Sequence, residues 1–204
     1  MNIIEPCCAE RQLGQLLRES RGHAVLFQTN GDMTLQKWMK ATMLMAGDRP
    51  RTLTLAVPIF TAKMMTAVAK YLQLGWVERL RLLTTDPLPP EMAQMLAKKA
   101  GCEAAVLAER VELAADGAVT EELLMFTGPD GTVAVQGAMP DVITPGLHLY
   151  AGIYGRTGGQ AVRSITDAWE ARFRARRYTL SLADSADVEQ AVKKKKTTRK
   201  TKKQ

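Results

Sequence analysis

The chain has 204 residues, of which 28 are basic, 21 are acidic and 46% are hydrophobic. These proportions fit a soluble globular protein with one core, and they exclude collagen, coiled-coil and fully disordered classes. No apolar run approaches the ~18 to 20 residues of a membrane span, and the start, MNIIEPCCAERQ, lacks the features of a signal peptide. With three cysteines, two of them adjacent, a disulfide framework is not expected. We therefore expect a cytoplasmic protein.

The net charge of +7 is concentrated at the C-terminal end. Residues 193–203, KKKKTTRKTKK, hold eight positive charges and no acid. Subtracting these eight from 28 leaves 20 basic against 21 acidic residues, so the body of the chain carries about −1. A run of like charges repels itself and buries no apolar area, so we expect a disordered polycation. The eight residues are Lys193, Lys194, Lys195, Lys196, Arg199, Lys200, Lys202 and Lys203.

Helix and strand patterns alternate through the first half of the chain. Leu13, Leu16 and Leu17 recur at helical spacing, whereas RTLTLAV alternates and is rich in β-favouring residues. Such alternation favours a parallel sheet covered by helices, with right-handed crossovers. The predicted elements are a helix over 9–20, a strand over 23–29, a helix over 34–46, a strand over 51–57, a helix over 61–72, a strand over 77–84, a helix over 90–100 and a strand over 103–107.

From Val111 the hydrophobic period changes to that of strands, and the segment 128–131, GPDG, predicts a tight turn between two of them. Another strand is expected over 148–154, followed by a long helix to about Tyr178. The predicted fold is α/β: a mixed sheet with a parallel βαβαβ first half, antiparallel hairpins in the second half and a long C-terminal helix. The expected division is an N-terminal helix over 1–22, an α/β domain over 23–180, and a linker with a disordered basic tail over 181–204.

Common catalytic and metal-binding motifs are missing from the sequence. The two histidines, His23 and His148, lie in no HxxxH, HExxH or Cys-paired spacing. There is no GxSxG elbow and no phosphate loop of the GxxxxGK[ST] type. We therefore expect no metal, no cofactor and no catalytic residue, and a binding protein is favoured over an enzyme.

Two sets of residues are candidates for binding phosphate. The segment 155–160, GRTGGQ, precedes the last helix, where backbone N–H groups could meet an anion beside Arg156, Gly158 and Gly159. The alternative is a turn that uses glycine for positive φ. The last helix could also extend the cationic surface of the tail, or present a solvated, ion-paired face. The arginines concerned are Arg172, Arg174, Arg176 and Arg177.

The order of elements over about three quarters of the chain resembles one phospholipase D-like domain, of the HKD phosphodiesterase and nuclease superfamily. The segment ITDAWEARFRARR looks like the closing helix of that family, with Trp169 and Phe173 as its aromatic pair. The resemblance implies a β-α-β-α-β unit followed by a hairpin. The other matching segments are LQKWMKA, RTLTLAVPIF, VERLRLLTTDP, ELLMFTGPDGTVAVQGAM and HLYAGIY.

The residues that give this family its chemistry are absent. The hairpin that would carry HxK reads Glu122-Leu-Leu-Met-Phe126, and Gly137-Ala-Met139 stands where GSxN is expected. Leucine and methionine can neither attack phosphorus nor hold a phosphate, so the resemblance implies the fold of a catalytically inactive homologue. Asp130 falls in the turn and fits there as a turn residue.

The sequence therefore predicts a non-enzymatic protein that binds the phosphate backbone of DNA or RNA through its Lys-rich tail. Polymeric phosphate releases counterions when lysines neutralise it, which gives affinity without sequence specificity. The expected partner is a nucleic acid rather than a membrane, and formation of a homodimer is kept as an open alternative. One alternative is a phosphodiesterase or nuclease of phospholipase D-like type with an atypical active site, in which His23 or His148 replaces the lost histidine across a dimer interface. Another is a scaffold or assembly protein of a phage or mobile element.

Overall fold

The computed structural model describes residues 2–5, 8–29, 33–47, 51–140 and 146–179. Within these residues nine strands form one sheet in the order β1-β2-β8-β7-β6-β3-β4-β5-β9. The strands are β1 (Asn2–Ile4), β2 (Val25–Thr29), β3 (Thr52–Ala56), β4 (Arg79–Thr84), β5 (Val111–Ala115), β6 (Leu123–Thr127), β7 (Thr132–Gln136), β8 (His148–Gly155) and β9 (Arg177–Tyr178). The helices are α1 (Ala9–Glu19), α2 (Leu35–Met43) with the short 3₁₀ turn η1 (Leu44–Ala46), α3 (Ala62–Gln73), α4 (Pro90–Ala100), α5 (Ala104–Arg110) and α6 (Gln160–Arg176).

The sheet is mixed, as the sequence predicts. Strands β3, β4 and β5 are parallel neighbours, and β1 is parallel to β2. Strand β7 runs antiparallel to both of its neighbours, β6 and β8, and these three strands join the two parallel groups, because β6 pairs with β3 and β8 pairs with β2. The α/β class, the antiparallel second half and the long C-terminal helix are therefore confirmed.

Local signals in the sequence place several helix ends correctly. Thr61 caps α3, its hydroxyl accepting a hydrogen bond from the backbone N–H of Met64 at 3.2 Å. Gly101 ends α4 with φ of 68°, a left-handed conformation that favours glycine. Thr61 therefore marks the start of α3, which connects β3 to β4, and Gly101 marks the end of α4, which lies between β4 and β5.

One predicted strand is wrong. The segment 103–107 lies at the start of α5, and the strand follows at Val111–Ala115. The sequence of α5, AAVLAER, is rich in alanine, the best helix former, and it buries only Leu107. The parallel connection from β4 to β5 therefore contains two helices instead of one. Strand β1 was also not predicted, since three residues give too short a pattern.

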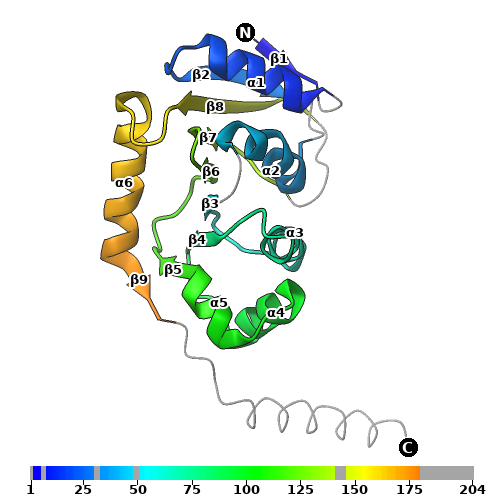
Figure 1. Ribbon diagram of the computed structural model, residues 1–204, viewed down its shortest axis with the longest axis vertical. Coiled ribbons are helices and arrows are strands. Elements are labelled where there is room, and N and C mark those ends of the chain that lie inside the picture. The colour runs from blue at the N-terminus through cyan, green and yellow to red at the C-terminus, as the bar shows by residue number, and fades with distance from the viewer. Residues whose placement is uncertain (1, 6–7, 30–32, 48–50, 141–145, 180–204) are drawn as a thin grey trace, which may run out of the picture.

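The two faces of the sheet are covered unequally (Figure 1). Helices α1 to α5 cover one face, and their apolar side chains form the larger core with the sheet. Helix α6 crosses the other face, where Trp169 and Phe173 pack on Ala56, Leu83 and Leu123. Part of this second face carries exposed apolar side chains, because one helix cannot cover nine strands.

Strand β9 brings the end of the described chain to the edge of the sheet. Arg177 and Tyr178 pair antiparallel with Ala114 and Leu113 of β5. The hydroxyl oxygen of Tyr178 accepts a hydrogen bond from the backbone N–H of Leu88 at 2.8 Å, which ties β9 to the segment before α4. The chain therefore leaves the fold beside the C-terminal end of α6, at the opposite edge of the sheet from β1 (Figure 1).

The substitution Phe173→Ala is expected to lower the free energy of unfolding by about 3 to 5 kcal/mol, because a fully buried ring leaves a cavity beneath α6. Phe173 is 1% exposed. Equilibrium unfolding in urea measures the change. The control is Leu149→Ala, at a side chain that is 54% exposed on the same face of the sheet, where we expect a change within about 0.5 kcal/mol. Similar losses in the two variants would contradict this account of how α6 is held.

Candidate anion-binding cleft

A polar cleft of about 510 Å³ lies between α6 and the sheet face that this helix crosses. Its floor consists of side chains from β3 to β7, and its wall is one side of α6 with the turn before it. The volume falls in the range of about 300 to 1,000 Å³ that small-molecule sites occupy. The lining residues are Thr52, Thr54, Arg79, Arg81, Glu112, Met125, Thr127, Thr132, Thr157, Gly158, Thr166, Glu170, Phe173, Arg174 and Arg177.

The polar side chains on the floor of the cleft result from the alternation of side chains along the strands. Thr52 and Thr54 alternate with buried leucines along β3, and Arg79 and Arg81 do the same along β4. Because β3 and β4 are parallel and in register, Thr52 lies opposite Arg79, and Thr54 lies opposite Arg81. Two hydroxyls and two guanidinium groups are thereby placed on one face of the sheet.

Arg81 anchors α6 to the floor of the cleft. Its Nε donates to Oε2 of Glu112 at 3.2 Å, and its two terminal nitrogens donate to the two carboxylate oxygens of Glu170 on α6. The guanidinium also lies over the ring of Phe173, 4.6 Å from the ring centroid. The side chain of Arg81 is only 13% exposed, and burying its charge costs solvation energy. The contacts with two carboxylates and one ring compensate this cost.

The other three arginines of the cleft are not neutralised in this way. Arg79 and Arg177 are exposed and form no ion pair with another described residue. Arg174 is 82% exposed, with its Nε 4.0 Å from Oε2 of Glu170. Since Arg81 already engages both glutamates, the lining of four arginines and two glutamates retains an excess of positive charge.

Hydroxyl groups line the end of the cleft that is nearest the start of α6. Thr132 is fully buried, and its hydroxyl donates to that of Thr127 at 3.3 Å and lies 3.4 Å from that of Thr157. The Thr157 hydroxyl in turn donates to the backbone carbonyl of Gly128. This chain of hydroxyls holds the turn before α6 against the hairpin of β6 and β7.

The described lining of the cleft offers few groups for acid–base chemistry. Among the residues that the structure describes, it contains no histidine, aspartate, lysine or cysteine, and its two glutamates are engaged by Arg81. Within the described ranges, no group of three or more histidine, cysteine, aspartate or glutamate side chains could hold a metal ion. Arginine and threonine side chains offer donors that suit phosphate oxygens and hydroxyl groups.

Arg172 points away from the cleft. Its Nε donates to Oδ2 of Asp116 at 2.8 Å, and its Nη1 lies 3.5 Å from Oε2 of Glu121. The guanidinium also lies 5.3 Å from the ring centroid of Trp169. The hydrogen bond from Arg172 is the largest cause that lowers the pKa of Asp116, with further lowering from the backbone N–H of Ala118. Arg172 thus holds α6 to the segment after β5.

Arg174, Arg176 and Arg177 are all exposed near the end of α6 and in β9. Arg174 and Arg177 line the cleft, whereas Arg176 lies near enough to Asp116 to contribute to the lowering of its pKa. These three residues form the cationic surface that directly precedes the predicted tail. The tail itself, including its lysines at 193–203, lies outside the described residues.

The turn before α6 contains the other predicted phosphate-binding residues. Gly158 has φ of 71°, and the backbone N–H of Gly159 donates to the carbonyl of Arg156 at 2.8 Å. Arg163 donates from Nη2 to the carbonyl of Gly158 at 3.3 Å. The side chain of Arg156 is exposed. The geometry is that of a glycine turn, and only Gly158 of the three residues also lines the cleft.

The two histidines lie at opposite ends of the β2–β8 pair. His148 is paired with Thr29 at the end of β2, whereas His23 precedes the start of β2. Five residues of strand separate these positions by about 13 Å or more. The segment Leu123–Phe126 of β6, where the resemblance noted in the sequence would place an HxK motif, is wholly buried and contains only apolar side chains.

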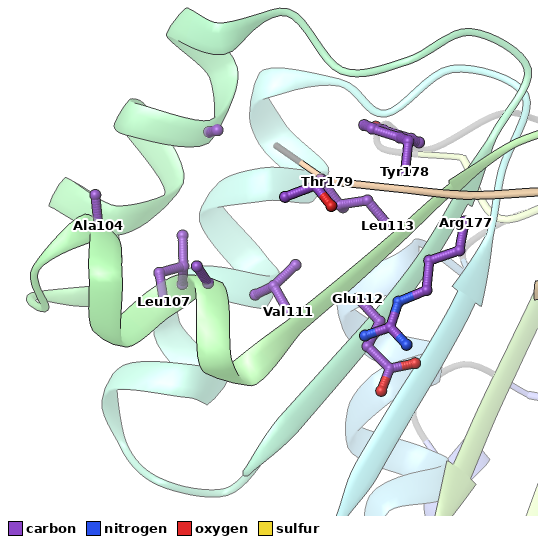
Figure 2. Close-up of a pocket in the computed structure, with 10 residues that line it drawn as sticks. Ala104, Leu107, Val111, Glu112, Leu113, Arg177, Tyr178 and Thr179 are labelled. Atoms are coloured by element: carbon purple, nitrogen blue, oxygen red, sulfur yellow. The ribbon is translucent and has the colours of Figure 1, made fainter. Parts of the chain in front are cut away.

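A second, apolar pocket of about 100 Å³ lies between α5, β5 and the end of β9. Figure 2 shows Leu107 and Val111 on one side of it, and the side chains of Glu112 and Arg177 side by side at its edge. Arg177 lines both this pocket and the larger cleft. The pocket is too small for more than a few atoms, so the larger cleft is the better candidate site.

Fold and site together define a mixed α/β protein with a polar cleft beneath its last helix. No family model matches the chain, and no curated protein matches it. Among solved structures, the chain is similar to polyphosphate kinase from Porphyromonas gingivalis, with a TM-score of 0.45 and 10% identity over 76% of this chain and 25% of that one. The chain therefore spans about a quarter of the length of that enzyme. Similarity of this degree carries no inference about activity.

Arg79, Arg81 and the threonines of the cleft were not among the site residues predicted from the sequence. The signal was present, because RTLTLAV and VERLRLLT each place two polar residues at every second position of a strand. In a sheet covered on both faces, such positions are expected to be apolar. Polar residues at positions 52, 54, 79 and 81 therefore indicate a face that a helix covers only in part.

The substitution Arg172→Gln is expected to raise the pKa of Asp116 toward its ordinary value of 3.8, because Arg172 is the largest cause of the lowered value. A carboxyl group whose pKa is lowered by folding stabilises the folded state above pH 3.8, and that stabilisation disappears as the pH falls through the lowered pKa. The variant should therefore be less stable than the parent at pH 7, and the difference should shrink below pH 3.8.

An NMR titration of the Asp116 carboxyl carbon measures the pKa, and urea unfolding at several pH values measures the stability. The control is Arg176→Gln, which removes the same charge but no hydrogen bond, and which should shift the pKa of Asp116 less. An unchanged pKa in Arg172→Gln would show that the pair does not form in solution.

Proposed function

We propose that this protein binds nucleic acid without sequence specificity, through its C-terminal Lys-rich segment and the exposed arginines at the end of α6. The observation that carries the proposal is the distribution of charge. Residues 193–203 contain eight cations and no acid, while the rest of the chain carries about −1. Lysines and arginines that neutralise phosphates release bound counterions, which favours association with any strand.

The position of the chain exit supports the proposal. Arg174, Arg176 and Arg177 are exposed directly before the point where the described chain ends at Thr179. A polyanion held by the Lys-rich segment would therefore meet further cations where the chain leaves the fold. Arg172 has a different role, because Asp116 and Glu121 already neutralise it. We therefore assign the folded part of the interface to Arg174, Arg176 and Arg177.

Two observations favour binding over phosphodiester hydrolysis. Among the described residues, the lining of the cleft contains no histidine, and its carboxylates are engaged by Arg81. His23 and His148 lie at opposite ends of the β2–β8 pair. A histidine nucleophile needs a second group within hydrogen-bonding reach as its acid or base, and the described positions of His23 and His148 do not bring the two histidines together to serve in this way.

The fourfold variant Lys193→Gln, Lys194→Gln, Lys195→Gln, Lys196→Gln should bind random duplex DNA more weakly and with less dependence on salt. Each phosphate contact contributes about −0.9 to the slope of log K against log salt concentration, so four lost contacts should reduce the slope by about 3 to 4. Fluorescence anisotropy of a labelled duplex, measured over a series of salt concentrations, gives both quantities.

The matched control changes four lysines on the other side of the sheet, with the same loss of charge. Lys63, Lys70, Lys98 and Lys99 are exposed on α3 and α4, and their replacement by glutamine should leave most of the slope intact. Equal reductions in the two variants would mean that net charge alone, and not the C-terminal segment, determines the binding.

A further inference from the structure

We propose that the cleft beneath α6 binds a sugar phosphate, with its exposed arginines on the phosphate and its threonines on the sugar hydroxyls. The ligand is either a free sugar phosphate or one unit of a nucleic-acid backbone. This site is distinct from the Lys-rich segment and does not depend on it. It would bind its ligand even if the proposed binding of duplex DNA proved wrong.

The excess of positive charge in the lining of the cleft favours an anionic ligand. Arg81 is held by Glu112 and Glu170, and this network leaves Arg79, Arg174 and Arg177 around the same cavity. Arg79 projects from β4, whereas Arg174 and Arg177 come from α6 and β9, so cations border the cavity on both its floor and its wall. Guanidinium groups bind phosphate oxygens with two parallel hydrogen bonds, which makes phosphate the best match for such a border.

The neutral side chains that line the cleft indicate which chemical group should accompany the phosphate in the ligand. Six of the described residues that line the cleft are threonines. The hydroxyls of Thr132, Thr157 and Thr166 donate to partners within the protein and can still accept a hydrogen bond, whereas a threonine hydroxyl without such a partner can both donate and accept. The aromatic side chain in the lining, Phe173, is 1% exposed and lies beneath the guanidinium of Arg81. No ring face of the lining is therefore available for stacking on a base. A sugar, with hydroxyl groups and no flat ring, fits this lining better than a nucleobase does.

The arrangement of α6 keeps the cleft open. Thr166, Glu170, Arg174 and Arg177 recur every three or four residues and line the cleft. Ile165, Trp169 and Phe173 lie on the adjacent stripe and pack against the sheet. Packing on one stripe and ion pairing at Glu170 therefore hold the helix at a distance from the floor, with room for a ligand beside it.

Isothermal titration calorimetry of the full-length protein with ribose 5-phosphate tests the proposal. Arg79→Gln and Arg174→Gln should each weaken binding about tenfold or more, because each removes a charge-assisted hydrogen bond to the phosphate. Both side chains are exposed, and unfolding curves should confirm that the variants remain folded. Arg18→Gln is the matched control, since Arg18 is exposed on α1, on the opposite face of the sheet.

Binding of ribose 5-phosphate that is lost in both cleft variants and kept in the control would support the site. No binding to the parent protein, or equal binding in all four proteins, would overturn it. Inorganic phosphate and ribose, tested separately, should each bind more weakly than ribose 5-phosphate. If inorganic phosphate binds as tightly as the sugar phosphate, the assigned role of the threonines is wrong.

A competition experiment distinguishes the two sources of the ligand. A five-residue oligothymidylate is added to the complex with ribose 5-phosphate, using the full-length chain with Lys193 to Lys196 changed to glutamine. Displacement of ribose 5-phosphate would assign the cleft to a nucleic-acid backbone, and no displacement would assign it to a free sugar phosphate. The same variant should bind ribose 5-phosphate as the parent does, so failure of the tail proposal and failure of the cleft proposal are separately visible.

Discussion

The attachment of α6 to the sheet is the constraint on which the functional features of this protein depend. Phe173 and Trp169 provide the apolar contact, and the Arg81–Glu170 pair provides the polar one, from the middle of β4 to the middle of the helix. This attachment sets the height of α6 above the sheet and thus creates the cleft. It also brings β9 to the edge of β5, where the chain leaves the fold.

The two faces of the sheet differ in the helices that cover them and in the side chains that they carry. One face is covered by α1 to α5 and is largely apolar, so it provides most of the buried area that stabilises the fold. The other face is apolar under α6 and at exposed positions such as Leu149, and it is polar where Thr52, Thr54, Arg79 and Arg81 lie. Arg81 and its carboxylates occupy space that apolar residues would fill in a purely structural layer. A charge network kept at that position is consistent with a face that serves binding.

Much of the fold follows from local sequence. Thr61 and Gly101 mark helix ends because capping and left-handed turns depend on the residue itself. The segment 103–107 was assigned wrongly because its apolar run is compatible with a strand, whereas its alanines favour a helix. The order of strands was beyond local reasoning, since β6 lies beside β3 only through contacts that are distant along the chain.

The site was less predictable than the fold. The exposed arginines of the last helix were visible in the sequence, but the partner of Arg172 is Asp116, 56 residues away. A helix pattern cannot show which of its cations will meet a carboxylate. Predicting the cleft would have required the register between β3 and β4, which places Thr52 beside Arg79 and Thr54 beside Arg81. Only the assembled sheet shows that these residues line one cavity with Arg174 and Arg177.

The central claim is that the face covered by α6, and not the face covered by α1 to α5, meets phosphate-bearing ligands. Hydrogen–deuterium exchange of the full-length protein, with and without a single-stranded oligonucleotide, tests this claim most directly. The account predicts added protection in α6 and β9 (residues 160–178) and in the first half of β4, with α1 to α4 unchanged. Protection confined to α1 to α4, or no added protection in any described element, would contradict it.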